Sequence, residues 1–397
     1  MCTVSTVTCA RPTRDIHLRR HTGWHTQSSG RTLTMVRLLH VFVPASLLMA
    51  AMTADAGQPQ ASADKSEAWS ASPTTSVVSE EKTFGNATVS LSGTLYLPAN
   101  ARKIPAVVVF HSASSATRDL SLYSHLKQML PPLGVAVFVY DRRGSGRSDH
   151  IGAHGDYQVL ADDGIAAQRM LAQDPRLDPK RIGFWGLSQG GWLSLLAASR
   201  SHETAFVISV SAPMTTPEVQ MNFAVANILR INGYSQADID AALSTRDAVN
   251  EAARGHSDRA TVQKRLDAVS GKPWFHLIYL ERNVTDDSLA SWTREMWHDP
   301  LPTLTAVKAP TLVIYGASDP WVPAKASVEA LRASASQRAN ITVAVVAGAD
   351  HAMNISTPLE AQVDPGKLSD EAPNSPEYFA LIASWLTAQG FAAVRAR

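Results

Sequence analysis

Three side chains whose types could together perform nucleophilic chemistry are spread widely along this sequence. The first, Ser188, lies at the centre of the motif GLSQG, between an apolar run at residues 181–185 and a helical pattern at 189–199. A G-x-S-x-G motif between a strand and a helix is typical of a nucleophile elbow, a tight turn that exposes the serine hydroxyl above a sheet. The positive end of the following helix then lies beside that hydroxyl. We therefore predict that Ser188 is a nucleophile.

A serine hydroxyl needs a general base, and the base needs a third group to orient it. Asp319 follows an apolar run at 312–315, and His351 follows another at 341–345. The carboxyl ends of parallel strands share the edge of a sheet at which ligands bind, so both side chains are expected near Ser188. The chain order serine, acid, histidine is the one expected for this elbow. We predict His351 as the general base and Asp319 as its orienting acid.

Other residues compete for these roles. Asp350 adjoins His351, but neighbours in sequence tend to point apart, so Asp350 is expected to cap its own loop. His298 and His276 lie in a segment of helical character, where a packed or solvated histidine is the ordinary outcome. His111 ends an apolar run but precedes the elbow, which breaks the chain order.

The elements that position these residues alternate between strands and helices. Residues 87–97 alternate apolar and polar side chains, which predicts a half-buried antiparallel strand pair. Runs that are apolar throughout predict strands of a parallel sheet covered on both faces, and they span 106–110, 135–140, 181–185, 206–210, 312–315 and 341–345. Helical patterns span 120–130, 156–173, 189–199, 324–333 and 377–388. The predicted fold class is α/β, with a mostly parallel central sheet flanked by helices.

One long segment interrupts this alternation. Residues 214–302 have helical periodicity and no convincing strand, so we predict a helical cap inserted between core segments 83–213 and 303–397. The cap's aromatic residues are expected mainly to form its own small core, with one or two lining a substrate pocket. The candidate pocket residues are His111, Trp274, Trp292 and Trp297.

The first 82 residues have a different character. Residues 35–56 combine a basic start, an uncharged apolar run and an A-x-A site, which predicts a signal peptide, cleavage after Ala56 and an exported protein, periplasmic or secreted. Residues 1–34 are then an upstream extension that is not normally translated. Residues 57–82 are poor in aliphatic side chains and are predicted to be a disordered linker.

Composition excludes several classes of function. The 36 Lys and Arg residues balance 35 Asp and Glu residues, which argues against a nucleic-acid binder. The apolar run of the leader is too short to span a membrane, so no stable insertion is expected after cleavage. The only cysteines, Cys2 and Cys9, lie in the leader and cannot staple the fold. No metal or organic cofactor is expected, and the sequence does not define an oligomeric state.

Residues 83–392 resemble an α/β-hydrolase of the esterase, dienelactone-hydrolase and prolyl-oligopeptidase-like branch. The resemblance rests on the elbow GLSQGG, the loops GASD and GADH that contain Asp319 and His351, and the turn DRRGSGRS at 141–148. It implies an oxyanion hole formed by the backbone N–H groups of Gln189 and Ala113. Ser112 stands where the family usually has glycine, and a turn that needs positive φ there would move the donor to Ser114.

Three functions are compatible with these residues. The first is a carboxylic-ester hydrolase that acts on small molecules through an acyl-enzyme on Ser188. The second is an exported prolyl-oligopeptidase-like serine aminopeptidase. The third is an inactive binding protein on the hydrolase fold, against which the intact set of Ser188, Asp319 and His351 argues.

Overall fold

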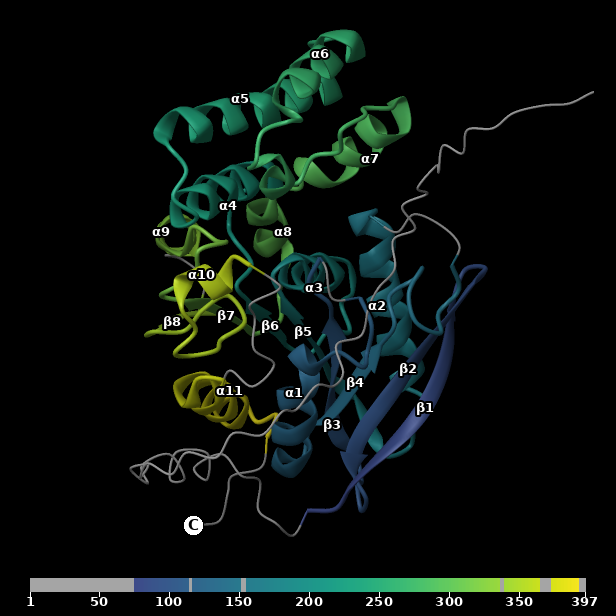
Figure 1. Cartoon of the computed structure of the whole chain (residues 1–397). Coiled ribbons are helices and arrows are strands. Elements are labelled where there is room, and N and C mark those ends of the chain that lie inside the picture. The colour runs from purple at the N-terminus through teal and green to yellow at the C-terminus, as the bar shows by residue number, and fades with distance from the viewer. Residues whose placement is uncertain (1–74, 114–115, 151–154, 336–338, 365–372, 393–397) are drawn as a thin grey trace, which may run out of the picture. The chain divides into compact units, whose positions relative to one another are not determined.

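A mostly parallel sheet lies at the centre of the protein (Figure 1). The structure is a computed structural model, and it describes residues 75–113, 116–150, 155–335, 339–364 and 373–392. These residues belong to a single unit that spans 60–397. The predicted upstream extension, the signal peptide and most of the linker lie outside the described residues.

The described strands form one eight-stranded sheet in the order β1-β2-β4-β3-β5-β6-β7-β8. Their bounds are β1 Val77–Asn86, β2 Val89–Pro98, β3 Ile104–Phe110, β4 Ala136–Tyr140, β5 Leu177–Leu187, β6 Val207–Val210, β7 Thr311–Gly316 and β8 Ile341–Val346. Strand β2 pairs antiparallel with β1 and β4, and every other pairing is parallel. The prediction of an α/β fold with a mostly parallel sheet is confirmed.

Helices cover both faces of this sheet. The core helices are α1 Ser124–Met129, α2 Tyr157–Leu171, α3 Gln189–Arg200, α9 Ala324–Ala335, α10 Leu359–Gln362 and α11 Pro376–Ala388, with short 3-10 turns at Ser121–Tyr123 and Pro131–Leu133. Alternate residues of β3 enter different apolar clusters: Val108 packs with side chains of α2 and α3, whereas Val109 packs with side chains of α1 and α11. This explains why the central strands are apolar at successive positions.

The edges of the sheet differ from prediction. Strand β1 begins at Val77, so the prediction of a disordered linker is wrong for residues 77–82. This strand has few aliphatic residues, but its charged side chains have partners far along the chain: Glu80 bonds Arg176, and Glu81 bonds Arg118. At the opposite edge, β8 is only partly buried although its sequence is apolar.

The predicted cap contains helices and no strand among its residues. It comprises α4 Pro217–Ile231, α5 Gln236–Ala253, α6 Arg259–Val269, a 3-10 turn at Phe275–Ile278, α7 Asp286–Met296 and α8 Pro300–Ala306. Figure 1 shows α4 to α7 gathered beyond one end of the sheet. Helix α8 runs past the predicted boundary at residue 302, because Leu304 and Val307 pack into the core beside α3. In the part of the chain that is described, no helix has the length and apolar character needed to cross a membrane.

Candidate active site

The turn between β5 and α3 holds Ser188 in an unusual backbone conformation. Its φ is 57° and its ψ is −119°, a region that non-glycine residues occupy only at a cost of about 1–3 kcal/mol. Glycines permit the turn, because a Cβ on Gly186 would overlap the carbonyl oxygen of Gly190. A Cβ on Gly190 would overlap the carbonyl oxygen of Phe110 at the end of β3. The sharp turn therefore presses the start of α3 against the loop that follows β3.

Asp319 and His351, which are far apart in sequence, form a hydrogen-bonded pair. The distance between His351 Nδ1 and Asp319 Oδ2 is 2.8 Å. The other carboxylate oxygen of Asp319 accepts backbone N–H groups from Trp321 and Val322, at 2.8 and 3.1 Å. Since the Asp319 side chain is only 1% exposed, these bonds fix its orientation. The structure thus brings together the two residues predicted as acid and base.

The environment of His351 favours its protonated form. Burial lowers the pKa of His351, but the charge of Asp319, the hydrogen bond to it and the charge of Asp350 act in the opposite direction and raise the pKa above its ordinary value. Because a carboxylate only accepts, Nδ1 carries the proton shared with Asp319, and Nε2 is left as the acceptor in the neutral ring. The imidazole therefore presents a basic nitrogen on the side away from Asp319.

Asp350, the competing acid, is engaged elsewhere. Its Oδ1 accepts the backbone N–H groups of Ala352 and Asn354, at 2.9 and 2.8 Å. Burial is the main cause of a pKa above the ordinary range for Asp350. These contacts are those of a residue that caps its own loop.

The loop after β3 carries the other predicted oxyanion donor, Ala113. Neither Ser112 nor Ala113 has a positive φ, so the serine at position 112 causes no strain and glycine is not required there. The alternative donor, Ser114, lies outside the described residues. His111 is 1% exposed and its ring is wedged edge-on between Tyr123 and Tyr140, so we assign it to the core rather than to a substrate pocket. Burial is the main reason that the pKa of His111 lies well below its ordinary value.

Three aromatic side chains lie around the start of α3. Tyr157 accepts a hydrogen bond from Gln189 Nε2 at 3.3 Å. The ring of His298, from the end of the cap, packs edge-on against Tyr157 and Trp192, with centroids 5.3 and 6.1 Å apart. Burial lowers the pKa of His298 to about 4, so this histidine is neutral at pH 7.

A carboxyl group of the cap, Glu295, lies near this cluster, and the sequence analysis did not identify it. A Cβ on Gly155 would overlap the Glu295 carboxylate, so the two segments are in direct contact. Burial raises the pKa of Glu295, and the positive charge of Arg142 partly opposes that rise. A lone glutamate on a helix carries no motif, so only the folded arrangement reveals it.

The cap tryptophans have different surroundings. Trp274 is 1% exposed in the cap's own core, where its indole N–H donates to Asp238, so its assignment to a pocket is corrected. Trp292 lines a cavity of about 230 Å³ within the cap, together with Tyr279, Leu289 and Glu295. Trp297 is half-buried beneath the guanidinium of Arg254. Of the three predicted tryptophans, Trp292 is thus the one that lines this cavity.

The described residues contain no cluster of three or more His, Cys, Asp or Glu side chains that could hold a metal ion. A strained serine, a histidine–aspartate pair and the start of a helix have the components that acyl transfer through a serine requires.

Topology and site together define the class of this protein, the α/β-hydrolases. A family model described as "Serine aminopeptidase, S33" matches residues 102–355, and the chain belongs to that family. This confirms the resemblance derived from the motifs.

Similarity to individual proteins is weaker. The chain is 38% identical over 78 residues to the polyketide transferase claH of Penicillium crustosum, covering 19% of this chain and 25% of the relative. It is 29% identical over 139 residues to the thiohydrolase aneE of Aspergillus aculeatus, covering 33% and 42%. These matches therefore span less than half of the relatives' length. Among solved structures, an esterase of Pyrococcus furiosus aligns with a TM-score of 0.49 and 17% identity, over 79% of this chain and 91% of the esterase.

Proposed function

We propose that this protein hydrolyses carboxylic esters through a covalent acyl-enzyme on Ser188. The Ser188 hydroxyl attacks the substrate carbonyl while Nε2 of His351 accepts its proton, and Asp319 stabilises the imidazolium. The proton then passes to the leaving alcohol. Water attacks the acyl-enzyme with His351 again as base, which releases the acid and regenerates the serine. The backbone N–H groups of Gln189 and Ala113 stabilise the oxyanion in both steps.

The 2.8 Å contact between His351 and Asp319 carries this proposal. The contact joins the loops after two neighbouring strands, β7 and β8, and the elbow follows β5 in the same parallel sheet. Ser188 alone would be an unusual turn residue, and the pair alone would be an ordinary ion pair. Their occurrence at the carboxyl ends of parallel strands in the order serine, acid, histidine is what favours catalysis.

The surroundings of the elbow favour an uncharged substrate. Tyr157, Trp192 and His298 pack against one another beside the elbow and bring no charge to it at pH 7, because the pKa of His298 is about 4. In an uncharged site, burial of methylene groups against apolar surface stabilises binding by about 0.8 kcal/mol per group. We therefore favour esters with short to medium acyl chains. Because one relative is a thiohydrolase, thioesters belong in the substrate series.

Glu295 supports a second candidate, a serine aminopeptidase. A carboxylate near the elbow would attract the free amino group of a peptide, and the matching family model carries that description. Burial raises the pKa of Glu295, which favours the uncharged form of its carboxyl group and weakens this attraction. We therefore rank the aminopeptidase second.

The deciding experiment compares p-nitrophenyl esters, thioesters and aminoacyl-p-nitroanilides on one purified sample. We expect kcat/KM for p-nitrophenyl acetate or butyrate to exceed that for every anilide, and the reverse order would replace the esterase with the peptidase. A fluorophosphonate probe should label the wild type and leave Ser188→Ala unlabelled. Full activity in a folded Ser188→Ala variant would refute the covalent route.

A further inference from the structure

The loop that carries Ala113 is held by an arginine from a different part of the chain. Arg142, in the turn after β4, donates from Nη2 to the carbonyl oxygens of His111 and Ser112, at 3.0 and 3.2 Å. Its own backbone N–H donates to the carbonyl of Ala116 at 2.8 Å. The side chain is only 8% exposed. A buried guanidinium that bridges two successive carbonyls restrains both peptide groups.

The direction of these carbonyls fixes the direction of the amides behind them. In a trans peptide the C=O and the N–H of one plane point to opposite sides. With the Ser112 carbonyl directed at Arg142, the N–H of Ala113 in the same plane must point away from Arg142. The preceding amide, that of Ser112, donates to the Tyr123 hydroxyl at 3.1 Å. Arg142 therefore sets the orientation of the one donor, Ala113, that the oxyanion hole requires from this loop.

The start of α3 lies against the same loop. A Cβ on Gly190 would lie 2.7 Å from the carbonyl oxygen of His111, which Arg142 also binds. The peptide groups that Arg142 restrains are therefore immediate neighbours of the elbow. A shift of this loop would change the distance between the Ala113 N–H and the carbon that Ser188 attacks.

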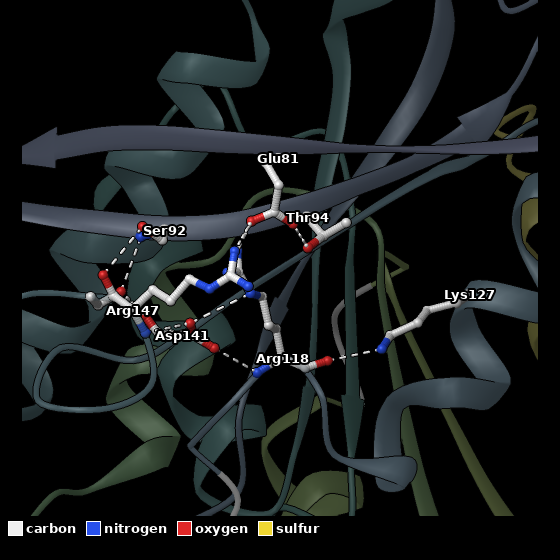
Figure 2. Close-up of polar contacts among 8 residues, drawn as sticks. Glu81, Ser92, Thr94, Arg118, Lys127, Asp141 and Arg147 are labelled. Atoms are coloured by element: carbon white, nitrogen blue, oxygen red, sulfur yellow. Dashed lines mark hydrogen bonds and ion pairs between the residues drawn. The ribbon is translucent and has the colours of Figure 1, made fainter.

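Asp141, next to Arg142, holds the far end of the loop (Figure 2). Its Oδ1 accepts the N–H of Arg118 at 2.9 Å, and its Oδ2 accepts the N–H of Arg147 at the same distance. A Cβ on Gly146 would overlap this carboxylate, which explains the glycine at that position of the turn. The Arg118 side chain forms an ion pair with Glu81 on β1, with 3.0 Å between Nη2 and Oε2. The turn DRRGSGRS thus anchors both ends of the loop to the sheet.

We propose that Arg142 is a positioning residue that orients the Ala113 N–H for the oxyanion, with Asp141 anchoring the same loop. The inference rests on the proposed acyl transfer at Ser188. It assigns the turn after β4 a role in the transition state rather than in binding the ground state. Interactions made only in the transition state change kcat and leave KM nearly unaltered.

The test compares Arg142→Met with Arg147→Gln. The second variant removes a cation from the same turn, but from a side chain that is 74% exposed, and it keeps the backbone N–H that bonds Asp141. For Arg142→Met we expect kcat to fall ~10–100-fold. A misaligned N–H group should cost part of the rate that is lost when an oxyanion donor is deleted. The inhibition constant of a trifluoromethyl ketone, which forms a tetrahedral adduct on the serine, should rise by the same factor. Arg147→Gln should match the wild type in both measurements.

Arg142→Lys covers the case in which the methionine variant does not fold. Lysine keeps the charge but lacks the planar fork that reaches both carbonyls, so we expect a smaller loss of kcat with an unchanged melting temperature. A folded Arg142→Met or Arg142→Lys variant with wild-type kcat, or with a raised KM alone, would overturn the inference. Fluorophosphonate labelling of wild-type Ser188 separates the two proposals: without labelling the proposed function fails, whereas labelling with unaffected Arg142 variants contradicts only the positioning role.

Discussion

The core and the cap of this protein are built in different ways. In the core, parallel strands end in short loops, and the candidate catalytic residues Ser188, Asp319 and His351 follow β5, β7 and β8. The cap packs helices around a small apolar cluster that contains Val225, Leu229 and Trp274. Its interior also encloses polar groups, such as Arg246, which is 0% exposed and bonds the carbonyl of Ile278. We therefore expect the core to fix the positions of the candidate catalytic side chains and the cap to provide the surface that a substrate contacts.

This contrast predicts where substitutions abolish the reaction and where they only modify it. The reacting groups that we propose in the core would act as a unit, so loss of one should remove most of the rate enhancement. Cap residues contact the core at separate points, for example Asn227, whose side-chain amide donates to the carbonyl of Pro320. Changes in the cap should therefore alter which substrate is preferred more than whether it reacts.

The largest effect is expected at His351. Replacing it with alanine removes the proposed base, and kcat/KM should fall by about 10⁴–10⁶-fold while the circular dichroism spectrum stays unchanged. Trp297→Phe in the cap, measured on p-nitrophenyl acetate, should lose less than about tenfold. Comparable losses in both variants would break the distinction between core and cap.

Much of the core was predictable because its patterns are local. The apolar runs predicted the parallel strands, and the flanking glycines placed Ser188 on a strand–turn–helix. Asp319 and His351 were predicted as candidates because each follows a strand, and the structure brings their side chains to 2.8 Å from one another. The first strand was missed, since the charges of Glu80 and Glu81 are neutralised by partners that only the fold brings near.

The remainder of the site has no local pattern. Glu295 is one acidic residue among several on its helix, and its approach to Gly155 depends on how the cap meets the core. The wedging of His111 between two tyrosines similarly depends on packing of β3, β4 and the turn at Ser121–Tyr123. Trp274 and Trp292 are both cap tryptophans without a surrounding motif. Only the residues packed around them in the fold show that Trp274 belongs to the cap core and that Trp292 lines a cavity.

A second contrast concerns stability and uses two glycines. Gly190→Ala would drive a Cβ into the backbone carbonyls of Phe110 and His111, which cannot move without disturbing β3. We expect a loss of more than about 3 kcal/mol in the free energy of unfolding, or failure to fold. Gly271→Ala in the cap meets nothing within 4 Å and has no positive φ, so its effect should stay within about 0.5 kcal/mol. Urea unfolding measures the free energy of unfolding of both variants, and equal values would contradict the expected difference between core and cap.

The pH dependence of kcat/KM distinguishes a titrating group of the core, His351, from one of the cap, Glu295. The base must be neutral, so kcat/KM should rise with pH and level off above the pKa of His351, with a midpoint above 6.5 because Asp319 raises that pKa. In Asp319→Asn the stabilising charge is lost while burial persists, so the midpoint of the residual activity should move to lower pH. Glu295→Gln removes a titrating group of the cap and should leave the midpoint in place. A midpoint that follows Glu295 instead would assign the observed titration to the cap.

The smallest effects are expected within the cap, between two tryptophans. Trp292 lines the cap cavity with Leu289 and bonds Asn250 through its indole N–H, whereas Trp274 is enclosed in the cap core. We propose that this cavity receives the acyl chain. Trp292→Phe would enlarge it, so kcat/KM for longer p-nitrophenyl esters should rise relative to acetate by a few-fold, at about 0.8 kcal/mol for each additional buried methylene. Trp274→Phe should lower the melting temperature and leave the chain-length profile unchanged, since its indole N–H loses Asp238 without opening space beside the substrate. A profile that shifts equally in both variants, or only in Trp274→Phe, would show that the cavity does not receive the acyl chain.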